Sequence, residues 1–400
     1  MVEFSLLLTA GIALSALAVA GSLAVRLGYS PIPAYILVGV VVGPAAPTVA
    51  GVSLGLLPGP GPMRILADLG VVLLLFFVGL ELSLDQLFSN RRRFLRAGAA
   101  DVGISLPLGF ALGLAFGFSL LEAAFLALVV FNSSTVIIAK SLVDLGWIAD
   151  AESRAVLGVV VIEDVLTALG FAVLSVLLVS GDDLAGVARS VGLSLAFMLA
   201  LVAAAYYGAG ALDRAFDDTT GEVFLLGVLG VGALVAGSGL LVGVSEAVAA
   251  FLVGTAFGRT GHVDRVERLV APSRDLFAAV FFFAIGLSTD PRLLAAMLAP
   301  VLVAATVTTA GQLASGYLAG RAYGLDGRRS VRVGCALTPR GEFSLVIAAF
   351  LVAAGTTPAL RETIPSFTVG YVLVTSVLGT VLMRNADRIS TRLLASSRGA

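Results

Sequence analysis

The chain has 400 residues, of which 58% are hydrophobic and only 13% charged, and its formal net charge is -1. Soluble proteins of this size are roughly 25% charged, so this composition excludes an ordinary soluble fold. The charge balance offers no basic face for nucleic acid. A single cysteine and a single histidine exclude a disulfide framework and a Cys/His metal cluster.

Long apolar segments recur from end to end, and each is long enough to cross a hydrocarbon core of ~30 Å as a helix. About thirteen spans are predicted, over residues 4–26, 31–48, 64–84, 95–117, 121–145, 153–180, 185–208, 222–240, 243–259, 274–289, 293–321, 331–354 and 366–384. These segments are too long and too weakly alternating to be barrel strands. The sequence therefore predicts an all-α polytopic membrane protein, with residues 1–400 forming one transmembrane domain in the cell membrane.

Basic residues predict the orientation of these spans. Of the 25 Lys and Arg residues, twenty lie on the side of the odd-numbered loops and the C-terminus, four lie on the side of the even-numbered loops, and Arg340 lies deep inside a span. Because basic residues favour the cytoplasmic side, we expect the N-terminus outside and the C-terminus in the cytoplasm.

Two stretches of the first half recur in the second half. The pattern of residues 28–43 returns in residues 243–258 with seven identities at one offset, and residues 74–80 resemble residues 281–287. Spans 1–6 therefore match spans 8–13, and a displacement of seven spans reverses the orientation in the membrane. Chance similarity between Gly-rich and Ala-rich helices is the alternative.

This repeat predicts how the chain is organised. Two inverted six-helix repeats, residues 4–180 and 222–384, are joined by a linker helix at 185–208 and followed by a short cytoplasmic tail at 385–400. Inverted repeats are typical of secondary transporters, whose binding site lies where the two repeats meet.

Span five contains a run of polar residues, Asn132, Ser133, Ser134 and Thr135. Ser and Thr side chains can bond their own backbone and loosen a helix. A broken helix exposes carbonyl groups and half-helix ends that suit a partly dehydrated cation. An ordinary kink remains the alternative.

Span six carries a carboxylate pair, Glu163 and Asp164, near the middle of its apolar run. Ionisable residues at such depth are costly and are functional candidates by default. Adjacent helix positions differ by about 100°, so only one of the two carboxylates can point squarely at a ligand. Such a group can bind either a proton or a cation, which is the competition that an antiporter needs. Pairing for helix packing alone is the alternative. Asp101 and Glu246 also fall inside predicted spans, with either role open.

Span twelve is interrupted by Pro339, Arg340, Gly341 and Glu342. Proline removes a backbone donor and glycine weakens a helix. Two interrupted helices in corresponding positions of two halves point to a transport site. Arg340 is expected to neutralise half-helix ends or to pair with Glu342 or Glu163.

Ordered segments along the chain together resemble the monovalent cation:proton antiporters, especially the Kef-type branch and its bacterial sodium/proton relatives. They are residues 34–44 (AYILVGVVVGP), 69–82 (LGVVLLLFFVGLEL), 133–135 (SST), 163–164 (ED), 249–254 (AAFLVG), 275–277 (DLF), 281–286 (FFFAIG) and 341–343 (GEF). The resemblance implies crossed broken helices five and twelve, a core and a dimerisation domain, a homodimer, and elevator-like alternation of the core. It also implies that Asp164 is the principal ligand of the transported Na⁺ or K⁺, with Glu163 beside it, and that no cofactor is used.

The chain departs from this family pattern in two respects. Many relatives carry a lysine in span eleven, nine residues before an arginine, and here that position holds Gln312 before Arg321. The lysine partner of the acidic pair is thus missing, and either Arg340 replaces it or Glu163 stays protonated. Gating by the nucleotide-binding regulatory domain of full-length Kef systems is not expected, and a separate cytoplasmic regulatory subunit is a candidate partner.

The function predicted is therefore exchange of sodium or potassium for protons. A Kef-like potassium efflux channel and a sodium-coupled symporter of organic anions on a related fold are the alternatives. An enzyme is not expected, because no nucleophile–base pair or metal constellation is present.

Overall fold

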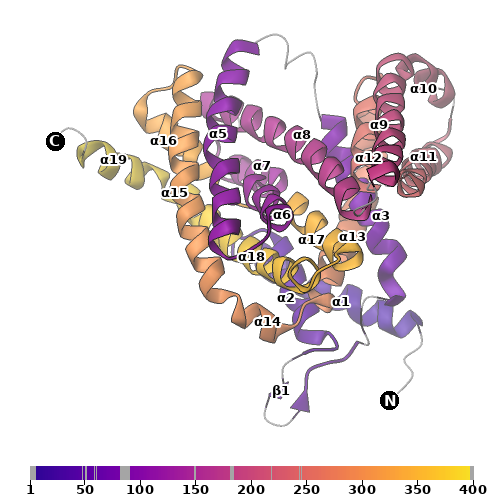
Figure 1. Cartoon of the computed structure of the whole chain (residues 1–400), viewed down its shortest axis with the longest axis horizontal. Helices are drawn as coiled ribbons and strands as arrows, with labels where there is room; N and C mark the ends of the chain where they lie inside the picture. The colour runs from indigo at the N-terminus through magenta and orange to yellow at the C-terminus, as the bar shows by residue number, and fades with distance from the viewer. Residues whose placement is uncertain are drawn as a thin grey trace. The chain divides into compact units, whose positions relative to one another are not determined.

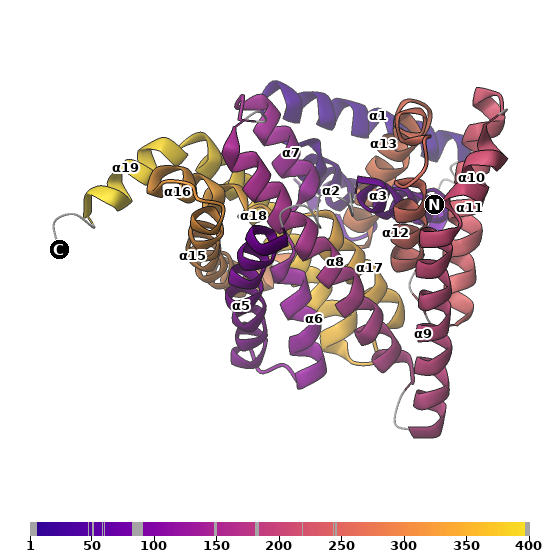
Figure 2. The same ribbon diagram turned by 90° about the horizontal axis from the view of Figure 1, so that it is seen from above.

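The computed structural model describes residues 6–396 except 47, 50, 51, 58, 60, 82–90, 148, 149, 181–183, 218, 243 and 245. Its described residues are almost entirely helical (Figures 1 and 2), apart from connections and a two-residue antiparallel ladder between β1 (Thr48–Val49) and β2 (Val52–Ser53). The helices are α1 (Leu6–Arg26), α2 (Pro31–Val42), α3 (Arg64–Glu81), α5 (Arg91–Ala115), α6 (Leu120–Phe131), α7 (Thr135–Asp144), α8 (Ala151–Ser180), α9 (Leu184–Tyr207), α10 (Ala209–Phe216), α11 (Gly221–Leu241), α12 (Glu246–Phe257), α13 (Val263–Ser288), α14 (Pro291–Ala296), α15 (Leu298–Ala322), α16 (Gly327–Ala336), α17 (Glu342–Ala354), α18 (Ile364–Arg384) and α19 (Ala386–Ser396), with short turns η1 (Gly61–Met63) and η2 (Ala359–Thr363).

In the described part of the chain, seven helices are long and apolar enough to cross a membrane. Four more apolar helices, α2, α6, α12 and α17, are shorter than a full crossing. The predicted spans at 121–145 and 331–354 each consist of two short helices, and the linker helix runs on into α10 through a 64° bend at Gly208. The multi-pass helical architecture is therefore confirmed, while the count of thirteen spans stays a prediction.

The chain forms two compact units, and each draws on both halves of the sequence. The first unit comprises residues 1–23, 34–84 and 168–289, and the second comprises residues 24–33, 85–167 and 290–400. The residues of both interrupted segments, together with Glu163 and Asp164, belong to the second unit.

The core of the first unit is aromatic. Phe76 of α3 and Phe216 at the end of α10 each contact Phe257 of α12 edge-on, with 5.4 Å between ring centres. Phe216 packs in turn on Phe224 of α11. Edge-to-face pairs add to the dispersion energy that holds membrane helices together, where lipid supplies little hydrophobic drive.

Two glycines bring α3 and α12 into backbone contact within the first unit. A side chain at Gly254 would collide with the Phe76 carbonyl, and one at Gly79 would collide with the Phe251 carbonyl. Small residues let membrane helices approach closely, so van der Waals contact extends to the backbones themselves.

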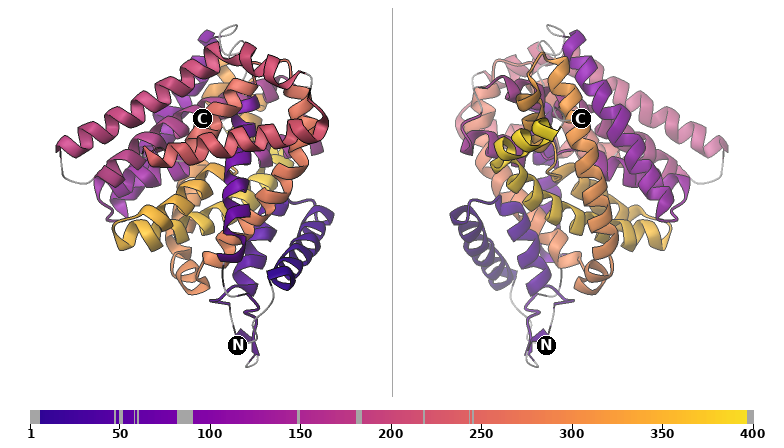
Figure 3. Two further views of the ribbon diagram at one scale, coloured as in Figure 1. Left: turned by 90° about the vertical axis from the view of Figure 1, so that its right-hand side faces the viewer. Right: turned by 90° about the vertical axis from the view of Figure 1, so that its left-hand side faces the viewer.

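In the second unit, α5 and α15 lie side by side, as the right-hand view of Figure 3 shows. α15 also packs on α16, α16 on α19, and α17 on α18. The apolar core between α7, α8, α15 and α16 includes Ile138, Val159, Ala319 and Val333. These contacts fix the helices that carry the polar residues described next.

We predict that Gly254→Ala destabilises the protein, because the new methyl group has no space against the Phe76 backbone. Overpacking of this kind costs about 1–3 kcal/mol, which thermal unfolding of the purified protein will show as a lowered Tm. Gly230→Ala in α11 is the matched control, because no atom lies within 4 Å of a side chain there. An unchanged Tm for Gly254→Ala would contradict the close packing.

Candidate functional site

The first interruption lies between α6 and α7. α6 ends at Phe131 and α7 begins at Thr135, so Asn132, Ser133 and Ser134 form an extended linker that is almost fully buried. The sequence places hydroxyl and amide side chains here because they can bond the backbone groups that the missing helical turn leaves open.

The second interruption lies between α16 and α17. α16 ends at Ala336 and α17 begins at Glu342, with Pro339 and Gly341 between them. Proline cannot donate to a helical ladder, and Gly341 takes the N-cap position of α17 with extended backbone. Both interruptions predicted from the sequence are therefore present in the structure.

The two linkers bond directly to each other. The Ser134 amide donates to the Pro339 carbonyl at 2.8 Å, and the Ser133 hydroxyl donates to the Leu337 carbonyl at 2.9 Å. The Ser134 hydroxyl donates to Glu342 Oε2 at 2.7 Å. Each linker thus supplies partners for polar groups of the other, as buried backbone requires.

The acidic pair of α8 faces the first linker. Asn132 Nδ2 donates to Asp164 Oδ1 at 2.9 Å, and the Thr135 hydroxyl donates to Asp164 Oδ2 at 3.0 Å. The Ser133 amide donates to Glu163 Oε2 at 2.7 Å. The structure therefore brings both carboxylates and the predicted polar run into one cluster.

Glu163 and Asp164 have different surroundings, as their position on one helix requires. Glu163 is completely buried and meets the carboxyl group of Asp101 from α5. Two oxygens, Asp101 Oδ2 and Glu163 Oε1, have no other hydrogen-bond partner in the described chain. Since carboxylates only accept, two carboxyl groups can bond each other only when one holds a proton.

Arg340 lies in the second linker and is 1% exposed. Its Nη1 donates to the Phe131 carbonyl at 3.0 Å and to the Ser133 hydroxyl at 2.7 Å. Phe131 is the last residue of α6, so the guanidinium lies at a half-helix C-terminus, where a positive charge is favourable. Of its two anticipated roles, the structure shows the contact with a half-helix end. Gln312 of α15 is buried nearby, within hydrogen-bond distance of Arg340 and Asp101.

Two further buried oxygen atoms of this region have no hydrogen-bond partner in the part of the chain that the structure describes. Asn132 Oδ1 and the Thr167 hydroxyl are buried and make no hydrogen bond within the described residues. Thr167 follows Asp164 by three residues on α8, which places the two on one face of the helix. Oxygen atoms that receive no hydrogen bond keep lone pairs free, and beside a carboxylate such atoms suit a transported monovalent cation. Sequence reasoning missed Thr167, although its spacing from Asp164 was the available signal.

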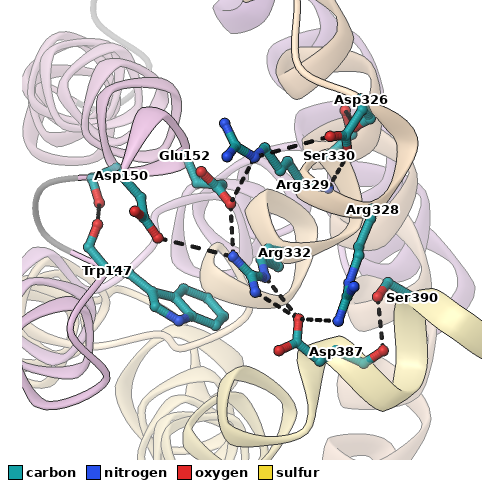
Figure 4. A network of polar contacts seen from close by, with 11 residues as sticks. Trp147, Asp150, Glu152, Asp326, Arg328, Arg329, Ser330, Arg332, Asp387 and Ser390 are labelled. Carbon is teal, nitrogen blue, oxygen red and sulfur yellow. Dashed lines mark hydrogen bonds and ion pairs between the residues drawn. The ribbon is translucent and has the colours of Figure 1, made fainter.

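A second polar network of the same unit lies at the N-terminal end of α8 (Figure 4). Arg332 of α16 contacts Glu152 at 2.9 Å and Asp387 of α19 at 2.7 Å, and its guanidinium lies 4.9 Å from the centre of the Trp147 ring. Glu152 is almost fully buried. This network connects α8, α16 and α19, and its residues lie outside the two linkers. Sequence reasoning did not anticipate it.

Comparison with known proteins assigns the fold and the family. The profile of the family described as "Sodium/hydrogen exchanger, transmembrane" matches residues 12–384. The chain is 34% identical to the K(+)/H(+) antiporter subunit KhtU of Bacillus subtilis, over 95% of this chain and 93% of that protein. It is 28% identical to the Na(+)/H(+)-K(+) antiporter GerN of Bacillus cereus, over 86% and 88% of the two chains.

Among solved structures, the sodium proton antiporter MjNhaP1 from Methanocaldococcus jannaschii matches with a TM-score of 0.69 at 16% identity, over 97% of this chain and 99% of that one. At this identity the match shows the fold alone. Fold, profile and relatives agree, and the chain belongs to the sodium/hydrogen exchanger family of membrane cation/proton antiporters.

Proposed function

We propose that this protein exchanges sodium or potassium for protons by alternating access, and that Asp164 is the carboxylate that binds the cation and the proton in turn. The observation that carries the proposal is the setting of Asp164. Both of its oxygens accept from side chains at the first interruption, Asn132 in the linker and Thr135 at the start of α7, at 2.9 and 3.0 Å. A carboxylate beside a broken helix is the arrangement in which transporters bind dehydrated cations.

The polar run supplies the other candidate ligands. Asn132 Oδ1 and the Thr167 hydroxyl have no hydrogen-bond partner in the described chain, which makes both oxygens candidate ligands of the cation. The Ser133 and Ser134 side chains bond the second linker, and we assign them mainly to holding the linkers together.

We assign Glu163 a supporting role, although it too is a candidate ligand of the sodium or potassium ion. One oxygen accepts from the Ser133 amide, and the carboxyl group bonds that of Asp101. A protonated Glu163 satisfies both contacts, and it adds no charge to the site when a cation arrives. Of the two explanations for the missing lysine in span eleven, we therefore favour a protonated Glu163 over replacement of the lysine by Arg340.

Arg340, Glu342 and Gln312 compensate charge at the half-helix ends. Arg340 bonds the C-terminal carbonyl of α6, and Glu342 stands in the first turn of α17, where a negative charge is stabilising. We infer that the linkers cross between inverted repeats. A second glycine contact supports the repeats: Gly39 of α2 meets the Phe283 backbone of α13, and these helices correspond to α12 and α3.

The proposal also covers the placement of the protein in the membrane and its assembly. We propose a cell-membrane protein with its N-terminus outside, its C-terminus in the cytoplasm and a homodimeric assembly. The names of KhtU and of the ammonium/H(+) antiporter subunit AmhT of Alkalihalophilus pseudofirmus, which is 30% identical over 96% of this chain, contain the word subunit. These names support a separate cytoplasmic regulatory subunit as a partner.

The names of relatives also include potassium, ammonium and sodium. Potassium and sodium therefore both have to be tested as the transported ion. A channel remains the second candidate for a Kef-like chain. Recording current under opposed cation and proton gradients separates the two, because a channel carries currents too large for a stoichiometric exchanger.

We predict that Asp164→Asn abolishes cation-dependent proton movement in proteoliposomes, because an amide cannot take up and release a proton in this role. Proton efflux from the lumen is followed after addition of sodium or potassium, with the wild type as reference. Unchanged proton efflux in Asp164→Asn would overturn the assignment. Repeating the wild-type measurement under an imposed voltage determines the stoichiometry.

We predict that Glu163→Gln retains transport within a few-fold of wild type, because glutamine can accept from Ser133 and donate to Asp101 as a protonated glutamate does. Glu163→Leu, of similar size, loses both hydrogen bonds and leaves buried groups unsatisfied, at a cost of about 1–3 kcal/mol each. Its transport and Tm should both fall. If Glu163→Gln is as inactive as Asp164→Asn, Glu163 works as a charged carboxylate and our assignment is wrong.

A further inference from the structure

The buried charge of Arg340 has an indirect partner. In the described chain its hydrogen bonds go to neutral oxygens, namely the Phe131 carbonyl, the Ser133 hydroxyl and the Gln312 side chain. A guanidinium that is 1% exposed is costly in an apolar interior without a counter-charge. Of the groups that bond Arg340, one that also bonds a carboxylate can bring a counter-charge to it.

Gln312 is the group that can carry it. Arg340 only donates hydrogen bonds, so the atom of Gln312 that faces it must be the amide oxygen. In this orientation Oε1 accepts from Arg340 Nη2 at 2.6 Å, and Nε2 donates to Asp101 Oδ1 at 3.1 Å. The Gln312 amide thus bonds the Arg340 guanidinium through its oxygen and the Asp101 carboxylate through its nitrogen.

Asp101 is held in place for this contact. Its Oδ1 also accepts from the hydroxyl of Ser315, in α15, at 2.7 Å, and lies 2.9 Å from the hydroxyl of Ser105, one turn along α5. Asp101 is completely buried. These hydrogen bonds fix the position of Asp101 Oδ1 against the Gln312 amide.

We propose that Asp101 is a positioning residue of the transport site, which fixes Arg340 at the end of α6 by applying its negative charge through the Gln312 amide. The inference rests on the proposed antiport function. It gives Gln312 a definite role, because a lysine at 312 would set two positive charges against each other and a glutamine does not. We call the contacts from Asp101 through Gln312 to Arg340 the relay. Losing the relay frees Arg340 to compete with the transported cation for Asp164.

Moving the negative charge from residue 101 to residue 312 tests this relay. Asp101→Asn removes the negative charge, and Gln312→Glu places a second one beside Asp101. The double variant Asp101→Asn/Gln312→Glu restores a single negative charge, now directly against Arg340. We expect each single variant to raise the cation KM about tenfold, and the double variant to return it to within about threefold of wild type.

A milder pair of variants keeps the test independent of severe folding defects. Ser315→Ala removes a donor from Asp101 and should raise the cation KM a few-fold. Thr309→Val on the same helix is its control, because the Thr309 hydroxyl makes no hydrogen bond in the described chain. The cation KM of Thr309→Val should equal that of wild type.

The outcomes separate the relay from the proposed function. A double variant whose KM is no better than that of the worse single variant overturns the relay, even when its Tm recovers, because Asp101 is then only structural. If wild-type protein moves no protons in response to sodium or potassium, the proposed function fails. The Tm of the double variant then tests only the contact between residues 101, 312 and 340, and a Tm that does not recover overturns the relay.

Discussion

The structure depends on one constraint, the need to satisfy backbone groups where two helices are broken inside an apolar environment. Each broken helix leaves amide and carbonyl groups that lipid cannot bond. The bond from the Ser134 amide to the Pro339 carbonyl meets this need across the two linkers, and Arg340 meets it at the end of α6. A polar site can persist here because its groups are also the ones that hold the fold together.

The same constraint explains why Glu163 and Asp164 differ. Glu163 meets the Asp101 carboxyl of α5 and accepts from the Ser133 amide of the first linker. Asp164 accepts from an amide and a hydroxyl side chain, those of Asn132 and Thr135. Adjacent residues on one helix therefore have different partners: Glu163 bonds the linker backbone, and Asp164 bonds two side chains.

Much of this could be predicted from the sequence, because hydropathy and polar interruptions are local signals. Proline at 339 and four polar residues from 132 marked both linkers, and depth in a span marked Glu163 and Asp164. Partners on other helices could not be found in this way. The link from Asp101 through Gln312 to Arg340 joins residues over 200 positions apart, and nothing in their local sequence indicates it. The predicted spans 31–48 and 243–259 correspond to the shorter helices α2 and α12, because hydropathy measures apolar length and not where a helix ends.

The network of Figure 4 gives the molecule an intrinsic optical probe. Trp147 is the only tryptophan in the chain, and its ring lies against the Arg332 guanidinium, which also holds Glu152 at the start of α8. From Glu152 to Asp164 the helix is continuous and rises about 18 Å. Indole emission responds to nearby charge, and the fluorescence of unmodified protein therefore reports from the far end of the helix that carries Asp164, the carboxylate proposed to bind the ion.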